Sequence, residues 1–183
     1  MGWLSRLFGA TPKEELDGIR LNTREPYWEL EGKTDFPLLL RALLVLVPDD
    51  SILYLEGGSP EGELLDFFNA KAVPEQTHVA IGTIWPRPRC YHVPATAQNL
   101  TDLADIAESC AWPELAIHFH VYRDGRLLLE WHDAFSQPML LSGSIPDDKV
   151  RGFSVALGMT YALNKGEVEQ VDARDEGPSG LHR

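Results

Sequence analysis

Apolar residues recur every three or four positions in four stretches of the chain, which is the spacing of amphipathic helices. Helices are therefore predicted over residues 36–47, 60–71, 100–110 and 150–161. In the second helix Ser59 is the expected N-cap and Pro60 the expected first residue, because both residue types favour those positions. Pro146 precedes the last helix and marks its start.

Short runs rich in β-forming residues lie between these helices and are bounded by Gly, Pro and Asp. They predict strands over residues 51–55, 78–85, 89–93, 115–122 and 126–133, with a short edge strand over 138–141. Neighbouring hairpins favour antiparallel pairing. We therefore predict an α+β two-layer sandwich, in which a mixed, largely antiparallel sheet of about five or six strands carries helices on one face.

The pattern divides the chain into three parts. Residues 1–33 are predicted to be an arm, in which Trp3, Leu4, Leu7 and Phe8 have the spacing of a short helix. Residues 34–164 form a single α+β domain. Residues 165–183 carry acids and glycines with few large apolar groups, so they are expected to be a flexible acidic tail.

The hairpin around Asp124-Gly125 has two possible registers. A two-residue turn pairs Tyr122 with Leu127 and mixes polar with apolar side chains on each face. A three-residue loop over 123–125 pairs His118 with Glu130 instead and sorts the faces cleanly. Because burial of one face fixes the register of a strand, we expect the three-residue loop.

That register places four potential ligands on one face of two adjacent strands: His118, His120, Glu130 and His132. Imidazole and carboxylate groups are ligands for zinc or another transition metal. One hypothesis is therefore a metal-binding protein or a metal-dependent enzyme. The alternative is that this face is wet and that these side chains are only solvated, since a sheet with helices on one side leaves its other side to water.

The composition fits a globular chain of one domain, with 183 residues of which 44% are hydrophobic. Acids outnumber bases by 28 to 16, for a net charge of −12. This balance argues against nucleic acid and against an anionic membrane surface as partners. No segment suits stable membrane insertion or resembles a signal peptide, and the two cysteines lack a C-x-x-C spacing, so a cytoplasmic protein is expected.

Between Arg41 and Lys71 the chain has no basic residue but six acids: Asp49, Asp50, Glu56, Glu61, Glu63 and Asp66. A dense negative face steers a basic protein towards it. The leading hypothesis is a non-enzymatic interaction module of regulatory, inhibitor or immunity type. It needs no cofactor and binds a more basic protein through these acids. The sequence does not predict its oligomeric state.

Arginines flank two of the predicted turns. Arg87 and Arg89 lie around one turn, and Arg123 and Arg126 lie around the other. If the two turns adjoin, these guanidinium groups form a site for a small anionic ligand.

Overall fold

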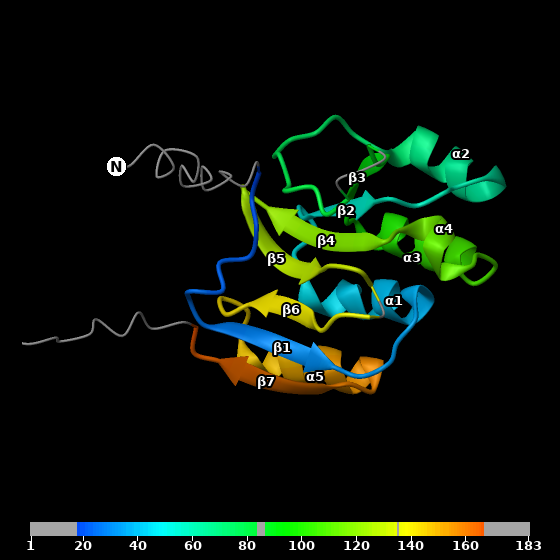
Figure 1. Cartoon of the computed structure of the whole chain (residues 1–183). Helices are drawn as coiled ribbons and strands as arrows, with labels where there is room; N and C mark the ends of the chain where they lie inside the picture. The colour runs from blue at the N-terminus through cyan, green and yellow to red at the C-terminus, as the bar shows by residue number, and fades with distance from the viewer. Residues whose placement is uncertain (1–17, 84–86, 135, 167–183) are drawn as a thin grey trace, which may run out of the picture.

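The computed structural model describes residues 18–83, 87–134 and 136–166. There, one open sheet of seven strands lies against a layer of helices, which confirms the α+β class (Figure 1). Every neighbouring pair of strands is antiparallel, and the sheet has one strand more than predicted. In spatial order the strands are β3 (Cys90–Pro94), β2 (Ile52–Glu56), β4 (His118–Arg123), β5 (Arg126–Trp131), β6 (Met139–Ser142), β1 (Tyr27–Glu31) and β7 (Thr160–Asn164).

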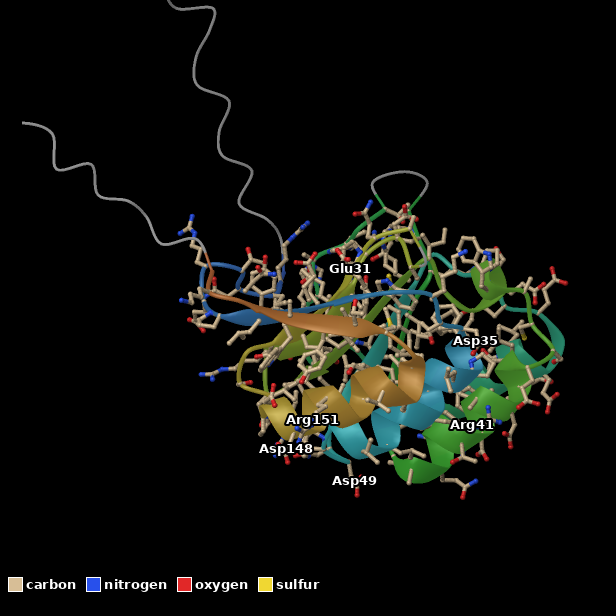
Figure 2. The ribbon with its side chains drawn as sticks, turned by 90° about the horizontal axis from the view of Figure 1, so that it is seen from below. Glu31, Asp35, Arg41, Asp49, Asp148 and Arg151 are labelled. Atoms are coloured by element: carbon tan, nitrogen blue, oxygen red, sulfur yellow. The ribbon has the colours of Figure 1, made fainter. Side chains whose placement is uncertain are left out.

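The described residues form five helices: α1 (Phe36–Leu46), α2 (Gly62–Lys71), α3 (Ala97–Ala107), α4 (Trp112–Leu115) and α5 (Asp147–Leu157). Helix α1 packs against both α3 and α5, and the three lie side by side on one side of the sheet (Figure 2). The core lies between this layer and the sheet, where Leu43, Phe119 and Phe153 are fully buried. In the described part of the chain, no helix is long and apolar enough to span a bilayer.

The ends of the helices follow from local chemistry. The Asp35 carboxylate accepts a hydrogen bond from the Leu38 amide at 2.8 Å and caps α1. The second helix begins later than predicted. Its N-cap is Glu61 and its first residue is Gly62, so Ser59 and Pro60 lie in the preceding loop.

Two strands arise where none was predicted. Strand β1 comes from residues 27–31 of the expected arm and pairs with β6 on one side and β7 on the other. Strand β1 does alternate, with Trp28 and Leu30 in the helix-side core, but it is only five residues long. Strand β7 begins inside the helix predicted over residues 150–161, which is wrong at its end because α5 stops at Leu157. The predicted strand over residues 78–85 is wrong for residues 78–83, which form only one isolated bridge, between Ile19 and Val79.

The predicted register of the β4–β5 hairpin is also wrong, and its sorting of faces is right except at Leu127, which lies with Tyr122 on the face of the histidines rather than with Leu129 and Trp131. Asp124 and Gly125 have φ angles of 48° and 71°, so they form a two-residue turn in which both residues are left-handed. Tyr122 pairs with Leu127 next to this turn. The register then shifts by one residue at Leu128, so that His120 pairs with Glu130. The turn alone would mix the faces, and the bulge restores the alternation.

The predicted short helix at residues 3–8 and the tail beyond residue 166 lie outside the described residues.

Candidate functional site

The face of the sheet opposite the helices is partly covered by two segments of the chain. Residues 18–22 and 72–83, here called the cover, lie over strands β2 to β5 and pair with each other. The Ile19 amide donates to the His78 carbonyl at 2.8 Å, and the Ala80 amide donates to the Ile19 carbonyl at 3.1 Å. Under the cover lies a small apolar cluster of Ile52, Tyr54, Val79, Tyr122 and Leu127. The expectation of a wet face is therefore wrong here.

Glu56 lies under the cover at the end of β2 and is fully buried. Its carboxylate accepts hydrogen bonds from the Tyr54 hydroxyl at 2.7 Å, the Gly82 amide at 3.0 Å and the Thr83 amide at 2.6 Å. These three donors compensate for the loss of water around the charge. Two of them belong to the cover. Glu56 therefore holds the cover and is not part of an acidic surface, as the sequence had suggested.

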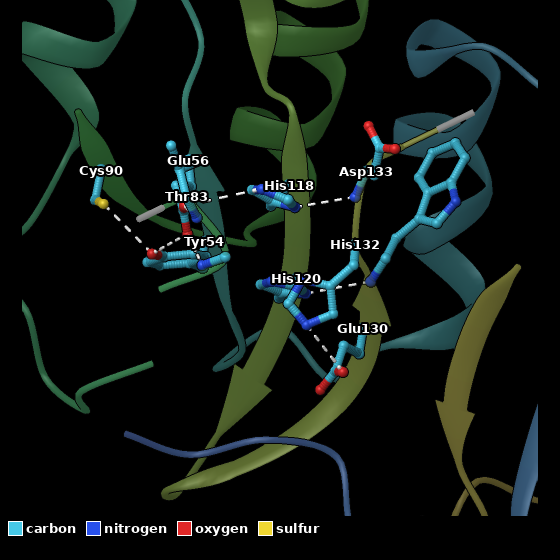
Figure 3. Close-up of polar contacts among 11 residues, drawn as sticks. Tyr54, Glu56, Thr83, Cys90, His118, His120, Glu130, His132 and Asp133 are labelled. Carbon is cyan, nitrogen blue, oxygen red and sulfur yellow. Dashed lines mark hydrogen bonds and ion pairs between the residues drawn. The ribbon is translucent and has the colours of Figure 1, made fainter. Parts of the chain in front are cut away.

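Glu130 on β5 holds the other segment of the cover. It is 8% exposed, and its carboxylate accepts a hydrogen bond from the Leu21 amide at 2.6 Å. The same carboxylate lies 3.1 Å from Nε2 of His132 (Figure 3). Each segment of the cover is thus attached to the sheet through a backbone amide and a buried carboxylate.

His118 and His120 point towards the cover from alternate positions of β4. Nδ1 of His118 accepts a hydrogen bond from the Asp133 amide at 2.9 Å, and Nδ1 of His120 accepts one from the Trp131 amide at 3.2 Å. An acceptor nitrogen carries no proton, so both neutral rings carry their proton on Nε2. The rings of His118 and His120 lie 5.3 Å and 4.7 Å from that of His132 (Figure 3).

Burial favours the neutral form of these imidazoles. It lowers the pKa of His118, although the nearby Glu56 carboxylate opposes the change. It lowers the pKa of His120 well below its ordinary value, and the neighbouring imidazoles of His132 and His118 act in the same direction. The His120 ring is 1% exposed, and its Nε2 has no hydrogen-bond partner within the described residues.

The four predicted ligands share a face, as expected, but they are not arranged as a ready donor set for a metal. In the part of the chain that the structure describes, no group of three His, Cys, Asp or Glu side chains is placed to hold a metal ion. The tautomers give the reason for His118 and His120. A metal bound at Nε2 needs a lone pair there and a donor at Nδ1, whereas both rings accept at Nδ1.

Two buried tyrosines lie beside the histidines under the cover, and neither was predicted as a site residue. Tyr54 stacks on His120 with ring centroids 5.5 Å apart, and its hydroxyl lies 3.3 Å from Sγ of Cys90. The Tyr122 hydroxyl lies 3.0 Å from Nδ1 of His92. Burial raises the pKa of the Cys90 thiol, which does not suit a nucleophile. The alternation of Ile52, Tyr54 and Glu56 was the available signal.

The acids predicted to form one face lie in different settings. Asp49, Glu61, Glu63 and Asp66 are exposed, whereas Asp50 forms an ion pair with Arg123 at 2.8 Å. A groove between α2 and α3, here called the acidic groove, is lined by Glu63, Asp66, Phe67, Asp102, Asp105 and Ile106. Asp102 and Asp105 were not predicted to join these acids, because they lie about forty residues away along the chain.

The hypothesis of an anion site between the two arginine turns is wrong. Strand β2 pairs with β3 and β4, and its residue Glu56 lies opposite Cys90 and His118. Arg87 and Arg89 therefore lie at the Glu56 end of β2. Arg123 lies at the other end, beyond the pair Ile52–Tyr122, where it binds Asp50.

No family model matches this chain, and searches of curated proteins and of solved structures found no match either. Its function must therefore be inferred from its own residues.

Proposed function

We propose that this protein is a non-catalytic interaction module of the cytoplasm whose acidic groove binds a more basic protein partner. The observation that carries the proposal is the gathering of four carboxylates on one groove: Glu63, Asp66, Asp102 and Asp105. Clustered negative charge raises the rate at which a basic partner encounters this surface.

Most of this charge is not neutralised within the protein. Asp105 pairs with Arg41 at 2.7 Å, whereas among the described residues Asp102 accepts only from the neutral Gln98 amide at 2.6 Å. Within the described ranges, Glu63 and Asp66 form no ion pair. A lysine or arginine from a partner would relieve the mutual repulsion of these carboxylates.

The groove also has apolar walls. Phe67 is buried and Ile106 partly buried, and both line the groove together with the carboxylates. Lys and Arg side chains carry apolar stems that pack on such surfaces while their charged heads meet carboxylates. This combination favours basic side chains of a protein over inorganic cations.

The cytoplasmic assignment has separate support. Cys90 and Cys110 are both free, and thiols persist in a reducing compartment. The polar residues under the cover give no support to a catalytic role, because Glu56 is fully buried and burial raises the pKa of the Cys90 thiol.

The proposal is tested by titrating the protein with a fluorescent peptide rich in lysine and arginine. We expect Glu63→Gln/Asp66→Asn to weaken binding about tenfold, since two exposed charge pairs of about 0.7 kcal/mol each amount to that factor. The matched control is Glu25→Gln/Glu31→Gln, which removes two exposed charges elsewhere.

The control separates the groove from the net charge of −12, which attracts any polycation. The control variant should lose less than about twofold in affinity. Equal losses in both variants would show that the groove has no special role. Native mass spectrometry of the protein purified from its own host then identifies the basic polypeptide that travels with it.

A further inference from the structure

We propose that the cover is released from the sheet on acidification, because the two carboxylates that hold it are also the nearest acceptors for the histidines beneath it. The proposal concerns residues 18–22 and 72–83 and does not depend on the acidic groove. Four structural features support this release: shared carboxylates, blocked protonation sites, direct contact of a histidine with the cover, and a separate core that keeps the domain folded.

Each carboxylate lies between backbone amides of the cover and an imidazole of the sheet side. Glu56 accepts from the Gly82 and Thr83 amides of the cover, and its Oε1 lies 3.9 Å from Nε2 of His118. Glu130 accepts from the Leu21 amide of the cover and lies 3.1 Å from Nε2 of His132. A charged imidazolium is a stronger donor to a carboxylate than a backbone amide. Protonation therefore shifts both carboxylates away from the cover.

The rings of His118 and His120 cannot take up a proton where they stand. In each, Nδ1 already accepts a backbone amide, from Asp133 and Trp131 respectively. A proton on Nδ1 would set two N–H groups against each other, so the ring must leave this position. The resulting imidazolium then needs a carboxylate as its partner, and the nearest are Glu56 and Glu130.

Movement of these rings reaches the cover directly. Gly82 packs so closely on His118 that a Cβ there would lie 2.7 Å from Nε2 of the ring. The other charged or titratable groups that face His118 are Glu56 on β2 and His132 and Asp133 after β5.

His120 has a different set of neighbours. It faces Tyr54 on β2, His118 on β4, His132 after β5 and Arg20 from the cover. The positive charge of Arg20 would repel an imidazolium at His120. Acid therefore weakens the attachment of both segments of the cover.

The rest of the domain has a separate source of stability. The helix-side core is a different cluster of buried residues from the small apolar cluster under the cover. It contains no titratable group among its members, so acid does not act on it directly. Release of the cover would expose Tyr54, Tyr122 and Leu127 while the helices stay packed.

The test is amide hydrogen exchange of the full chain, measured by mass spectrometry at about pH 7.5 and about pH 5.5 and corrected for the intrinsic effect of pH. We expect protection of residues 18–22 and 72–83 to fall at least tenfold more than that of α1 on going to the lower pH. If cover and α1 keep the same ratio of protection at both values, the proposal is overturned.

A variant that cannot titrate decides whether the histidines are responsible. His118→Asn/His132→Gln retains an acceptor near Nδ1 of His118 and a donor near Nε2 of His132, but neither side chain accepts a proton. It should hold the cover equally well at both pH values. An acid-dependent loss as large as that of the unaltered protein would overturn the proposal.

The matched control is His78→Gln, which removes an exposed imidazole that lies in the cover and pairs with Glu75. This variant should lose protection on acidification as the unaltered protein does. If the double variant does not fold, His132→Gln alone is used, since this side chain is partly exposed. It should retain more protection at low pH than His78→Gln, and the opposite order would overturn the proposal.

Discussion

On strands β2, β4 and β5 the side chains that face the helices are apolar, as at Leu53, Phe119 and Leu129. The residues between them, such as Glu56, His118 and His120, face the cover and are held by hydrogen bonds. Apolar burial is not directional and hardly depends on pH, whereas hydrogen bonds to charged groups are directional and depend on protonation. The two faces of one sheet should therefore respond differently to the same perturbation.

The largest expected effect comes from the helix side. Phe119 is fully buried and packs against Phe36 with ring centroids 5.7 Å apart. Phe119→Ala should lower the free energy of unfolding by about 4 kcal/mol at every pH, since it removes a large side chain and leaves a cavity. Urea denaturation measures this loss. Val155→Ala, at an exposed position of α5, serves as the control and should stay within about 0.5 kcal/mol.

A smaller effect is expected under the cover. Glu56→Gln keeps the shape of the side chain but sets an amide N–H₂ group against donors from Tyr54, Gly82 and Thr83. The free energy of unfolding should fall by about 2 kcal/mol, because a buried donor loses its acceptor. Limited proteolysis should then cut within residues 72–83 faster. Glu61→Gln, at the exposed N-cap of α2 where the side chain makes no capping hydrogen bond, should do neither, and equal behaviour would contradict the role of Glu56.

The pH dependence of stability also distinguishes the two faces of the sheet, with a smaller expected effect. Because the folded protein has lowered pKa values at His118 and His120, the unfolded chain binds more protons than the folded one. The contribution of these histidines to the free energy of unfolding is therefore fully present above the pKa of about 6.5 that histidine has in the unfolded chain. It decreases as the pH drops below this pKa, by up to about 1.4 kcal/mol per pH unit for each imidazole. Urea midpoints between about pH 7.5 and about pH 5.5 measure the slope.

His120→Asn supplies the comparison for this slope, because its amide oxygen can accept from the Trp131 amide in place of Nδ1. The slope should be shallower in this variant. A slope that is unchanged, or stability that rises with acid, would show that His120 is not buried in the neutral form.

The smallest effect is expected at the surface. Asp50→Asn breaks an ion pair with Arg123 in which both side chains are largely exposed. Solvent screens such pairs, so the free energy of unfolding should change by less than about 0.5 kcal/mol in urea denaturation. A loss comparable with that of Glu56→Gln would mean that exposed and buried carboxylates do not differ in the way described.

The helix side of the sheet was predictable from the sequence, because helices and strands with one apolar face have strong periodicity. The helices α1, α3 and α5 appear near their predicted positions. Strands β1 and β7 were missed because a strand such as Thr160–Asn164 is short and largely exposed. Its place in the sheet is fixed by pairing with β1 rather than by its own pattern.

The cover side was predictable only in part. The shared face of His118, His120 and Glu130 follows from alternation along the strands. That loops would bury this face did not follow, because residues 72–83 have no periodicity that indicates where they pack. The acidic stretch shows the same limit, since Glu56 is buried while Asp102 joins the groove from another helix. Nearness along the chain does not establish nearness in space.

The bulge at Leu128 decides which face of the sheet each following residue of β5 occupies. A two-residue turn and one extra residue together keep Leu129 and Trp131 towards the helices and Glu130 towards the cover. If the intact sequence paired from the same turn without a bulge, all three would exchange, burying a carboxylate in the main core and turning a tryptophan outward. Deleting Leu128 would remove only the extra residue and keep the pairs Val121–Leu129 and His120–Glu130, so the hairpin should tolerate the loss of one residue at the bulge.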